Sequence, residues 1–177
     1  MKLPTHKQCL ELLDEHNVPD NVRKHSFAVN KVAVFLAKKL KEKGIRIDVE
    51  LVDRASLLHD LDKIPTLGTH DHGKMTREIL STKGYPELGR IIHNHLYSAL
   101  LIDGLTWEEK IVNYSDKRCT EDNIVTLDSR VKYIKEKYAK KYKDVNEDAE
   151  NRLRSLETEI FSIIGLDPEK LGEYIGN

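Results

Sequence analysis

Apolar residues recur at helical spacing along most of this chain, and this pattern limits the fold more than any other feature. In the clearest stretch, Val22, Val29, Val32, Leu36 and Leu40 are spaced so that their side chains fall on one face of a helix. No run alternates apolar and polar residues for long enough to predict a strand. We therefore expect an all-α fold.

Capping and breaking residues divide the chain into successive helices. Thr5 with Gln8, and Thr106 with Glu109, form capping boxes, in which each side chain accepts a hydrogen bond from the backbone of the other residue. Asp20 is expected to cap the second helix. The expected helices run from about residue 5 to 16, 20 to 44, 48 to 60, 71 to 83, 86 to 101, 106 to 118, 127 to 143 and 146 to 164, with a short one opened by Asp167 and Pro168.

The size and charge of the chain limit its organisation and its partners. Its 177 residues, 39% of them hydrophobic, suffice for one domain with a real core, so we expect a single domain over residues 1–177. The formal net charge of -1 provides no overall positive field for nucleic acid. Tyrosines and lysines mix late in the chain, but Val131, Ile134, Tyr138 and Tyr142 form an inward stripe there. We therefore do not expect a nucleic-acid partner.

Targeting signals and cysteine motifs are not evident. The N-terminal MKLPTHKQCLELL contains no apolar run long enough for a secretion signal, and no later stretch approaches the length of a membrane span. Cys9 and Cys119 form no CxxC motif, and we expect both to be packed thiols. These features predict a cytoplasmic protein without a membrane partner.

Histidines and aspartates interrupt the apolar faces at places where water is not expected to reach. His25 shares a face with Val29, and His72 lines up with Met75 and Ile79. The full set is His25, His59, Asp60, His72, His95 and Asp116. Burying these groups without partners would cost several kcal/mol each, whereas divalent cations would satisfy them together. We therefore expect metal ligation.

Two neighbouring histidines in the segment IIHNH have to be distinguished. Residues two apart on a helix face nearly opposite ways, so His93 and His95 cannot both enter one site. The apolar stripe that contains Leu88 and Ile92 includes His95. We therefore expect His95 in the site and His93 outside it.

The donor types favour certain metals. Four imidazoles with two carboxylates suit a pair of first-row ions better than they suit calcium, which prefers an all-oxygen cage. We expect two divalent ions, iron or manganese first, with zinc, nickel, cobalt and magnesium as alternatives.

The order of these residues resembles the H…HD…H…H…D signature of the two-metal HD superfamily of phosphohydrolases. The similarity covers an HD core at about residues 20–120. The segments that carry it are RKHSFAVNKVAVFLA, LLHDLDKI, HGKMTREIL, IIHNH and EKIVNYSDK. The C-terminal extension, about residues 127–177, lies outside it and either covers the site or builds a homodimer. Asp62 stands where the HDIG form of the signature has glycine, and whether it hydrogen-bonds a ligand histidine stays open.

The resemblance implies a role for each ligand and a type of reaction. Asp60 would bridge the metals, with His25, His59 and Asp116 completing one site and His72 and His95 the other. A hydroxide between the two cations would then cleave a phosphoester or phosphoanhydride bond. Similar HD proteins include dinucleoside polyphosphate hydrolases and nucleotidases, so we expect a nucleotide or dinucleotide as the small-molecule substrate.

Two cationic residues are candidates for binding the substrate phosphate. Lys63 follows Asp60 by three residues, so on a helical continuation it stays beside the metals, and the family keeps a lysine there. Arg118 is a second candidate, equally compatible with a salt bridge. Two other functions stay open: a di-iron oxygenase on the same scaffold, and a noncatalytic nucleotide-sensing module, which should lack a ligand or Lys63.

Overall fold

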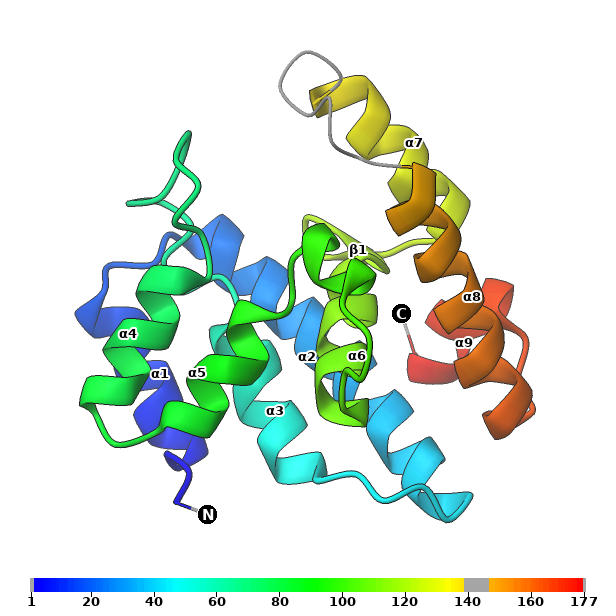
Figure 1. Cartoon of the computed structure of the whole chain (residues 1–177), viewed down its shortest axis with the longest axis horizontal. Helices are drawn as coiled ribbons and strands as arrows, with labels where there is room; N and C mark the ends of the chain where they lie inside the picture. Colours follow the sequence, from blue (N-terminus) through cyan, green and yellow to red (C-terminus); the bar gives the residue numbers. More distant parts are fainter. Residues whose placement is uncertain (1, 139–146, 177) are drawn as a thin grey trace.

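The computed structural model describes residues 2–138 and 147–176, and it confirms the all-α fold (Figure 1). The helices are α1 (His6–Glu15), α2 (Asp20–Glu42), α3 (Val49–Leu58), α4 (Lys74–Thr82), α5 (Pro86–His93), α6 (Trp107–Asp116), α7 (Leu127–Tyr138), α8 (Glu147–Ile164) and α9 (Leu171–Ile175), with short 3-10 helices η1 (Tyr97–Leu101) and η2 (Pro168–Lys170). Two short strands, β1 (Cys119–Thr120) and β2 (Asn123–Ile124), pair antiparallel. None of the helices in the described ranges is long and apolar enough to cross a membrane.

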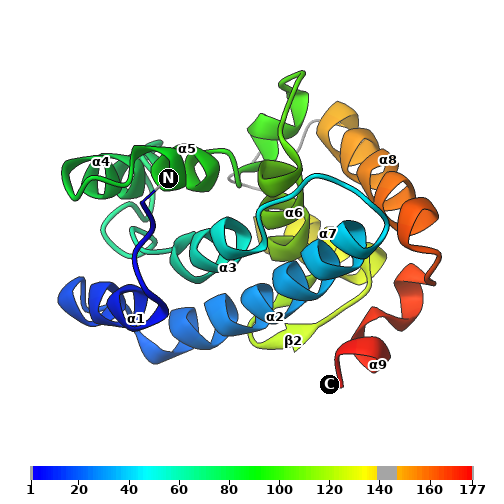
Figure 2. The same ribbon diagram turned by 90° about the horizontal axis from the view of Figure 1, so that it is seen from below.

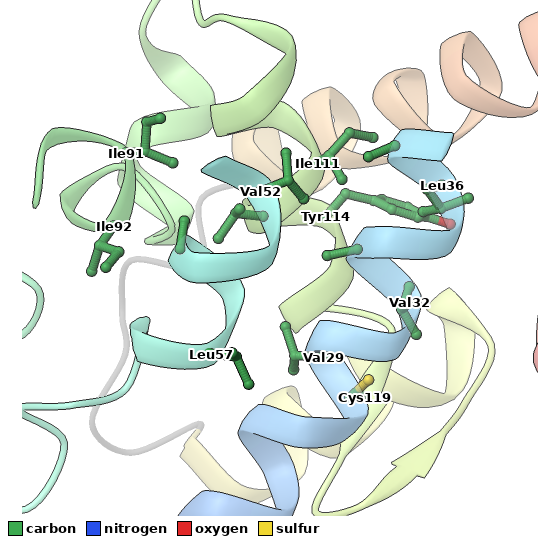
Figure 3. Close-up of a cluster of buried hydrophobic side chains, with 14 of the residues drawn as sticks. Val29, Val32, Leu36, Val52, Leu57, Ile91, Ile92, Ile111, Tyr114 and Cys119 are labelled. Atoms are coloured by element: carbon green, nitrogen blue, oxygen red, sulfur yellow. The ribbon is translucent and has the colours of Figure 1, made fainter. Parts of the chain in front are cut away.

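The core forms where α2 packs against α3 and α6. Val29, Val32 and Leu36 of α2 are fully buried, and Figure 3 shows them beside Val52 of α3 and Tyr114 of α6. Each buried aliphatic side chain stabilises the fold by about 1.5 to 3 kcal/mol relative to exposure. Figures 1 and 2 show α1 and α4 at one end of α2, and α8 and α9 at the other. The packing of α2, α3 and α6, the three central helices, therefore fixes where the loops that connect them lie.

Several helix boundaries differ from those expected. Asp20 does not cap α2: Pro19 has the extended backbone of the N-cap, and Asp20 lies in the first turn, where a negative charge is favourable near the helix N-terminus. The helix expected from residue 71 begins only at Lys74, because Gly73 has a left-handed φ of 77° that no helix contains. The helix expected to reach residue 101 ends at His93, and η1 follows it.

The C-terminal helices α7 and α8 lie against each other. Arg154 of α8 forms a 2.7 Å ion pair with Asp128 of α7, and Lys135 of α7 forms a 2.6 Å pair with Glu150 of α8. Val131 and Ile134 are buried, as the inward stripe predicts. The side chain of Tyr138, the whole of Tyr142 and the part of the expected helix beyond residue 138 lie outside the described residues.

Candidate metal centre

The predicted metal ligands all meet in one place, most of them at or near helix ends. The ligand positions are His25 within α2, His59 and Asp60 directly after α3, His72 before α4, His95 after α5 and Asp116 as the last residue of α6. His59 is 0%, Asp60 2% and His95 2% exposed. The structure therefore brings six side chains from five parts of the sequence into one largely buried cluster.

Three of the histidines reach the cluster from turns rather than from helix faces. The expectation that His72 lies on a helix with Met75 is wrong, since the left-handed Gly73 separates it from α4. His95 lies two residues beyond the end of α5, where its backbone N–H donates to the carbonyl of Ile92. His93 ends α5 half-buried and is not among the facing donor groups found in the described residues. The structure thus places His95 in the cluster and His93 outside its facing donor groups, as the helical phase predicted, although the helix has ended before His95.

Asp60 lies between two groups of histidines. Its Oδ2 is 3.6 Å from Nε2 of His59 and 4.0 Å from Nε2 of His25. Its Oδ1 is 3.1 Å from Nε2 of His72 and 3.9 Å from Nε2 of His95. Each oxygen therefore completes a separate set of three donors, and within each set the donor atoms lie within 4.8 Å of one another.

Asp116 belongs with the first of these groups. Its Oδ1 is 3.0 Å from Nε2 of His25 and 3.8 Å from Nε2 of His59. One side of Asp60 thus faces two imidazoles and a second carboxylate, and the other side faces two imidazoles. This is the division of ligands that the resemblance implies.

Hydrogen bonds at Nδ1 orient all four imidazoles toward the cluster. The acceptors are the carbonyl of Glu121 for His25 (2.8 Å), of Ser56 for His59 (2.8 Å) and of Ile92 for His95 (2.6 Å), and Oδ1 of Asp62 for His72 (2.8 Å). A carbonyl can only accept, so Nδ1 of His25, His59 and His95 carries a proton and their Nε2 atoms face inward. Nε2 of His59 is buried without a hydrogen-bond partner. Inward Nε2 atoms, one of them orphaned, fit bound divalent cations.

Asp62 makes the contact that the sequence left open. It is 1% exposed, its Oδ1 accepts from Nδ1 of His72, and its Oδ2 accepts from the backbone N–H of Thr76 at 2.9 Å. The carboxylate at the position of the signature glycine therefore links the His72 ring to the first turn of α4.

The electrostatic environment shifts the pKa values of the buried groups in different directions. Burial raises the pKa of Asp60, but His59, Lys63 and His72 outweigh it and hold this pKa well below its usual range. Burial, followed by the nearby His72, lowers the pKa of His95 well below normal. Burial also lowers the pKa of His72, but Asp60 and Asp62 overcome this and raise it to about 9. Without metal, Asp60 is charged, His95 neutral and His72 protonated.

We expect a divalent cation that binds at His72 to release a proton. A folded-state pKa of about 9 means that the ring holds a proton at pH 7.5, which the metal must displace from Nε2. Affinity at this position should therefore fall as the pH is lowered below 9 and level off above it. Calorimetric titration of Mn²⁺ in buffers of different ionisation enthalpy measures the protons released. Zero release at pH 7.5 would contradict the expectation.

Lysines at the cluster contact both of its carboxylates. Lys63, predicted from the sequence, places Nζ 3.1 Å from Oδ2 and 3.2 Å from Oδ1 of Asp60. Lys117, which the sequence analysis missed, is 2% exposed and donates to Oδ2 of Asp116 at 3.0 Å and to the carbonyl of His95. A lysine beside a predicted ligand carries no periodic signal, so only the structure identifies it.

Arg118 does not reach the cluster, contrary to its candidacy as a phosphate contact. It is 1% exposed and donates to the hydroxyl of Tyr114 (2.5 Å), to Oε2 of Glu157 (3.0 Å) and to the carbonyls of Val125 (2.8 Å) and Pro168 (2.7 Å). Arg118 lies two residues beyond the end of α6, in the turn before β1, and its side chain contacts groups away from the cluster. Its donors are occupied in joining α6 to the C-terminal part of the chain.

The fold and the cluster define a helical protein with His/Asp groups that could hold a metal ion. The chain belongs to the HD domain family, whose model matches residues 22–127, and this match supports a family of the metal-dependent hydrolase type. An uncharacterised protein of Methanocaldococcus jannaschii is 31% identical over 140 residues, which cover 71% of this chain and 82% of that protein. The tRNA (cytidine(56)-2'-O)-methyltransferase of Picrophilus torridus is 31% identical over 179 residues, which cover 93% of this chain but 49% of that protein. The chain thus spans about half the length of that relative. No solved structure matches the chain significantly.

Proposed function

We propose that this protein is a phosphohydrolase that uses two divalent cations to cleave a phosphoester or phosphoanhydride bond. The observation that carries the proposal is the position of Asp60, whose two oxygens face two separate sets of donor atoms. The residues that would hold the cations are His25, His59 and Asp116 on one side, His72 and His95 on the other, and Asp60 between them. Iron or manganese suits this donor set best, with zinc, nickel, cobalt and magnesium as alternatives.

The chain's own side chains prepare the site for a phosphorylated substrate. When bound, the cations would acidify a water molecule and neutralise charge on the phosphoryl oxygens. Asp60 stays charged beside Lys63, and Lys117 holds Asp116 in place. The Nδ1 hydrogen bonds keep the imidazole rings in orientation, so little rearrangement is needed on binding.

Removal of Lys63 tests the phosphate contact. Lys63→Ala should keep both metal ions but lower kcat/KM by about 30- to 1000-fold, equivalent to roughly 2 to 4 kcal/mol, because a charge-assisted hydrogen bond to the reacting phosphoryl group is lost. Lys63→Arg should recover only part of the activity, since a forked guanidinium replaces a compact ammonium. Steady-state kinetics with elemental analysis measure both effects. The control is Lys74→Ala, because the Lys74 side chain is 58% exposed on α4. Equal kcat/KM for the two alanine variants would show that Lys63 does not bind the substrate.

We propose a nucleotide or dinucleotide as the substrate, and a hydrolysis screen tests this directly. The panel should contain nucleotides, dinucleotides and cyclic nucleotides, each with manganese, iron or cobalt. A transfer RNA belongs in the panel because one relative is named as a tRNA methyltransferase, although half of that protein lies outside the match. Two bound metals without hydrolysis of any compound would contradict the proposal. Oxygen consumption by the iron-loaded protein would instead identify an oxygenase.

A further inference from the structure

Arg130 of α7 reaches the metal centre from outside the part of the chain that the family model covers. The match ends at residue 127, before Arg130 in the sequence. Its Nη2 lies 3.8 Å from Oδ1 of Asp116, and its side chain is 15% exposed. Within residues 2–138 and 147–176, its guanidinium makes no hydrogen bond, and the buried Nε has no partner. A buried donor without an acceptor is costly, so this group calls for an acceptor that the chain itself does not supply.

The charge of Arg130 is not needed to neutralise Asp116. Oδ2 of that carboxylate already accepts from Lys117 at 3.0 Å, and Oδ1 lies 3.0 Å from Nε2 of His25. Asp60, the other carboxylate of the cluster, also has a cationic partner of its own, since it contacts Lys63. Arg130 is therefore a surplus positive charge beside the cluster.

Tyr97 of η1 provides a second unsatisfied group in the same region. Its hydroxyl is buried without a hydrogen-bond partner, and the Lys117 ammonium lies 4.9 Å from the centre of its ring. Lys117 also donates to Asp116, the carboxylate that Arg130 approaches. Tyr97 thus offers a second hydrogen-bond donor in the neighbourhood of Arg130.

We propose that Arg130 and Tyr97 form an anion site beside the metal centre, where they bind oxygens of the substrate phosphate. A guanidinium presents several N–H donors in a fixed fork that matches phosphate oxygens, and a phenol hydroxyl can add one more. This inference rests on the proposed hydrolase function and narrows its substrate. Because Asp60 and Asp116 are already paired with lysines, the charge of bound cations and of Arg130 remains for the ligand. A phosphate monoester or a nucleotide polyphosphate matches that charge better than a phosphodiester with its single negative charge.

The same arrangement gives the C-terminal helices a part in the site. The 2.7 Å pair between Arg154 and Asp128 and the 2.6 Å pair between Lys135 and Glu150 hold α7 against α8. Backbone N–H of Arg130 donates to the carbonyl of Thr126 at 3.1 Å, so the residue lies in the first turn of α7, directly after the β1–β2 hairpin. Of the two roles left open for the C-terminal extension, this position favours the one in which it covers the site.

Binding of inorganic phosphate to the manganese-loaded full-length protein tests the inference without relying on turnover. In calorimetric titration, the dissociation constant for phosphate should be about 10- to 100-fold higher for Arg130→Gln than for the unchanged protein, because a charge-assisted bidentate contact is lost. Arg130→Lys should recover part of the affinity, and Tyr97→Phe should weaken binding by about 3- to 10-fold. Lys132→Gln removes an exposed charge from the same helix and should bind phosphate like the unchanged protein.

The outcomes separate this inference from the proposed function. Equal phosphate affinity of Arg130→Gln and Lys132→Gln would overturn the anion site, as would failure of the unchanged protein to bind phosphate. Loss of manganese from both Arg130→Gln and Arg130→Lys would also overturn it, because Arg130 would then serve Asp116 instead. Phosphate binding that depends on Arg130, without hydrolysis of any compound in the screen, would keep the anion site and reject the hydrolase. In hydrolysis, Arg130→Gln should raise KM for monoesters more than for diesters, and an equal change for both would contradict the substrate class.

Discussion

Asp60→Asn is expected to release both metal ions and to lower hydrolysis by at least about 1000-fold, the largest effect on activity of any single substitution. Both sets of donors share Asp60 and use different oxygens of it. An amide keeps the shape but loses the charge, and its nitrogen cannot act as a ligand on one of the two sides. The variant should therefore lose the metal ions at both positions together. Substitution of a ligand residue on one side should release mainly the ion on that side.

Elemental analysis of three variants provides the comparison. Asp60→Asn should retain almost no metal, and His95→Ala should keep about one ion per chain. His93→Ala should keep both ions and its activity, because His93 lies outside the facing donor groups of the described chain. If Asp60→Asn holds two ions, or if His93→Ala loses one, the assignment of ligands around Asp60 is wrong.

Arg118→Ala should produce the largest loss of stability, about 3 to 5 kcal/mol in the free energy of unfolding. The substitution removes the donor to Glu157 and to the carbonyls of Val125 and Pro168 at a position that is 1% exposed. It leaves buried acceptors unpaired and a cavity beside Tyr114, and each of these is unfavourable. Urea denaturation in the presence of EDTA measures the change without a contribution from bound metal.

An exposed arginine on the same part of the fold provides the control. Arg154 also pairs with carboxylates, but its side chain is 44% exposed, so Arg154→Ala should cost no more than about 1 kcal/mol. Arg118→Ala should also destabilise the packing of the C-terminal helices, whose η2 supplies the Pro168 carbonyl. A similar loss for the two variants would show that the Arg118 network adds little beyond a surface ion pair.

The sequence predicted which side chains gather in the cluster because polar groups on apolar helical faces need partners. It could not indicate the correct backbone for His72, because the spacing to Met75 does not reveal that Gly73 takes a left-handed conformation. The two-residue strands were also beyond reach, since they are too short to show alternation and depend on pairing with each other.

The cationic residues were the hardest part of the site to predict. Arg118 is near Asp116 in sequence but turns away from it, whereas Arg130 is distant in sequence and returns to it through the hairpin and α7. Proximity in sequence therefore identifies Lys63 beside Asp60 but does not distinguish Arg118 from Arg130. Contacts between elements make that distinction, and these are not visible in residue spacing.

The hydrogen bonds at Nδ1 bear on how this site tolerates sequence change during evolution. Three of the four rings are held by main-chain carbonyls, those of Glu121, Ser56 and Ile92, and no point mutation deletes a carbonyl. The side chains at these three positions can vary while the acceptors persist. His72 alone depends on a side chain, that of Asp62. Substitutions among related proteins should therefore disturb the His72 side of the centre most. There, a change of the Asp62 codon alters the hydrogen bond that holds one ring, while the other three rings stay in place.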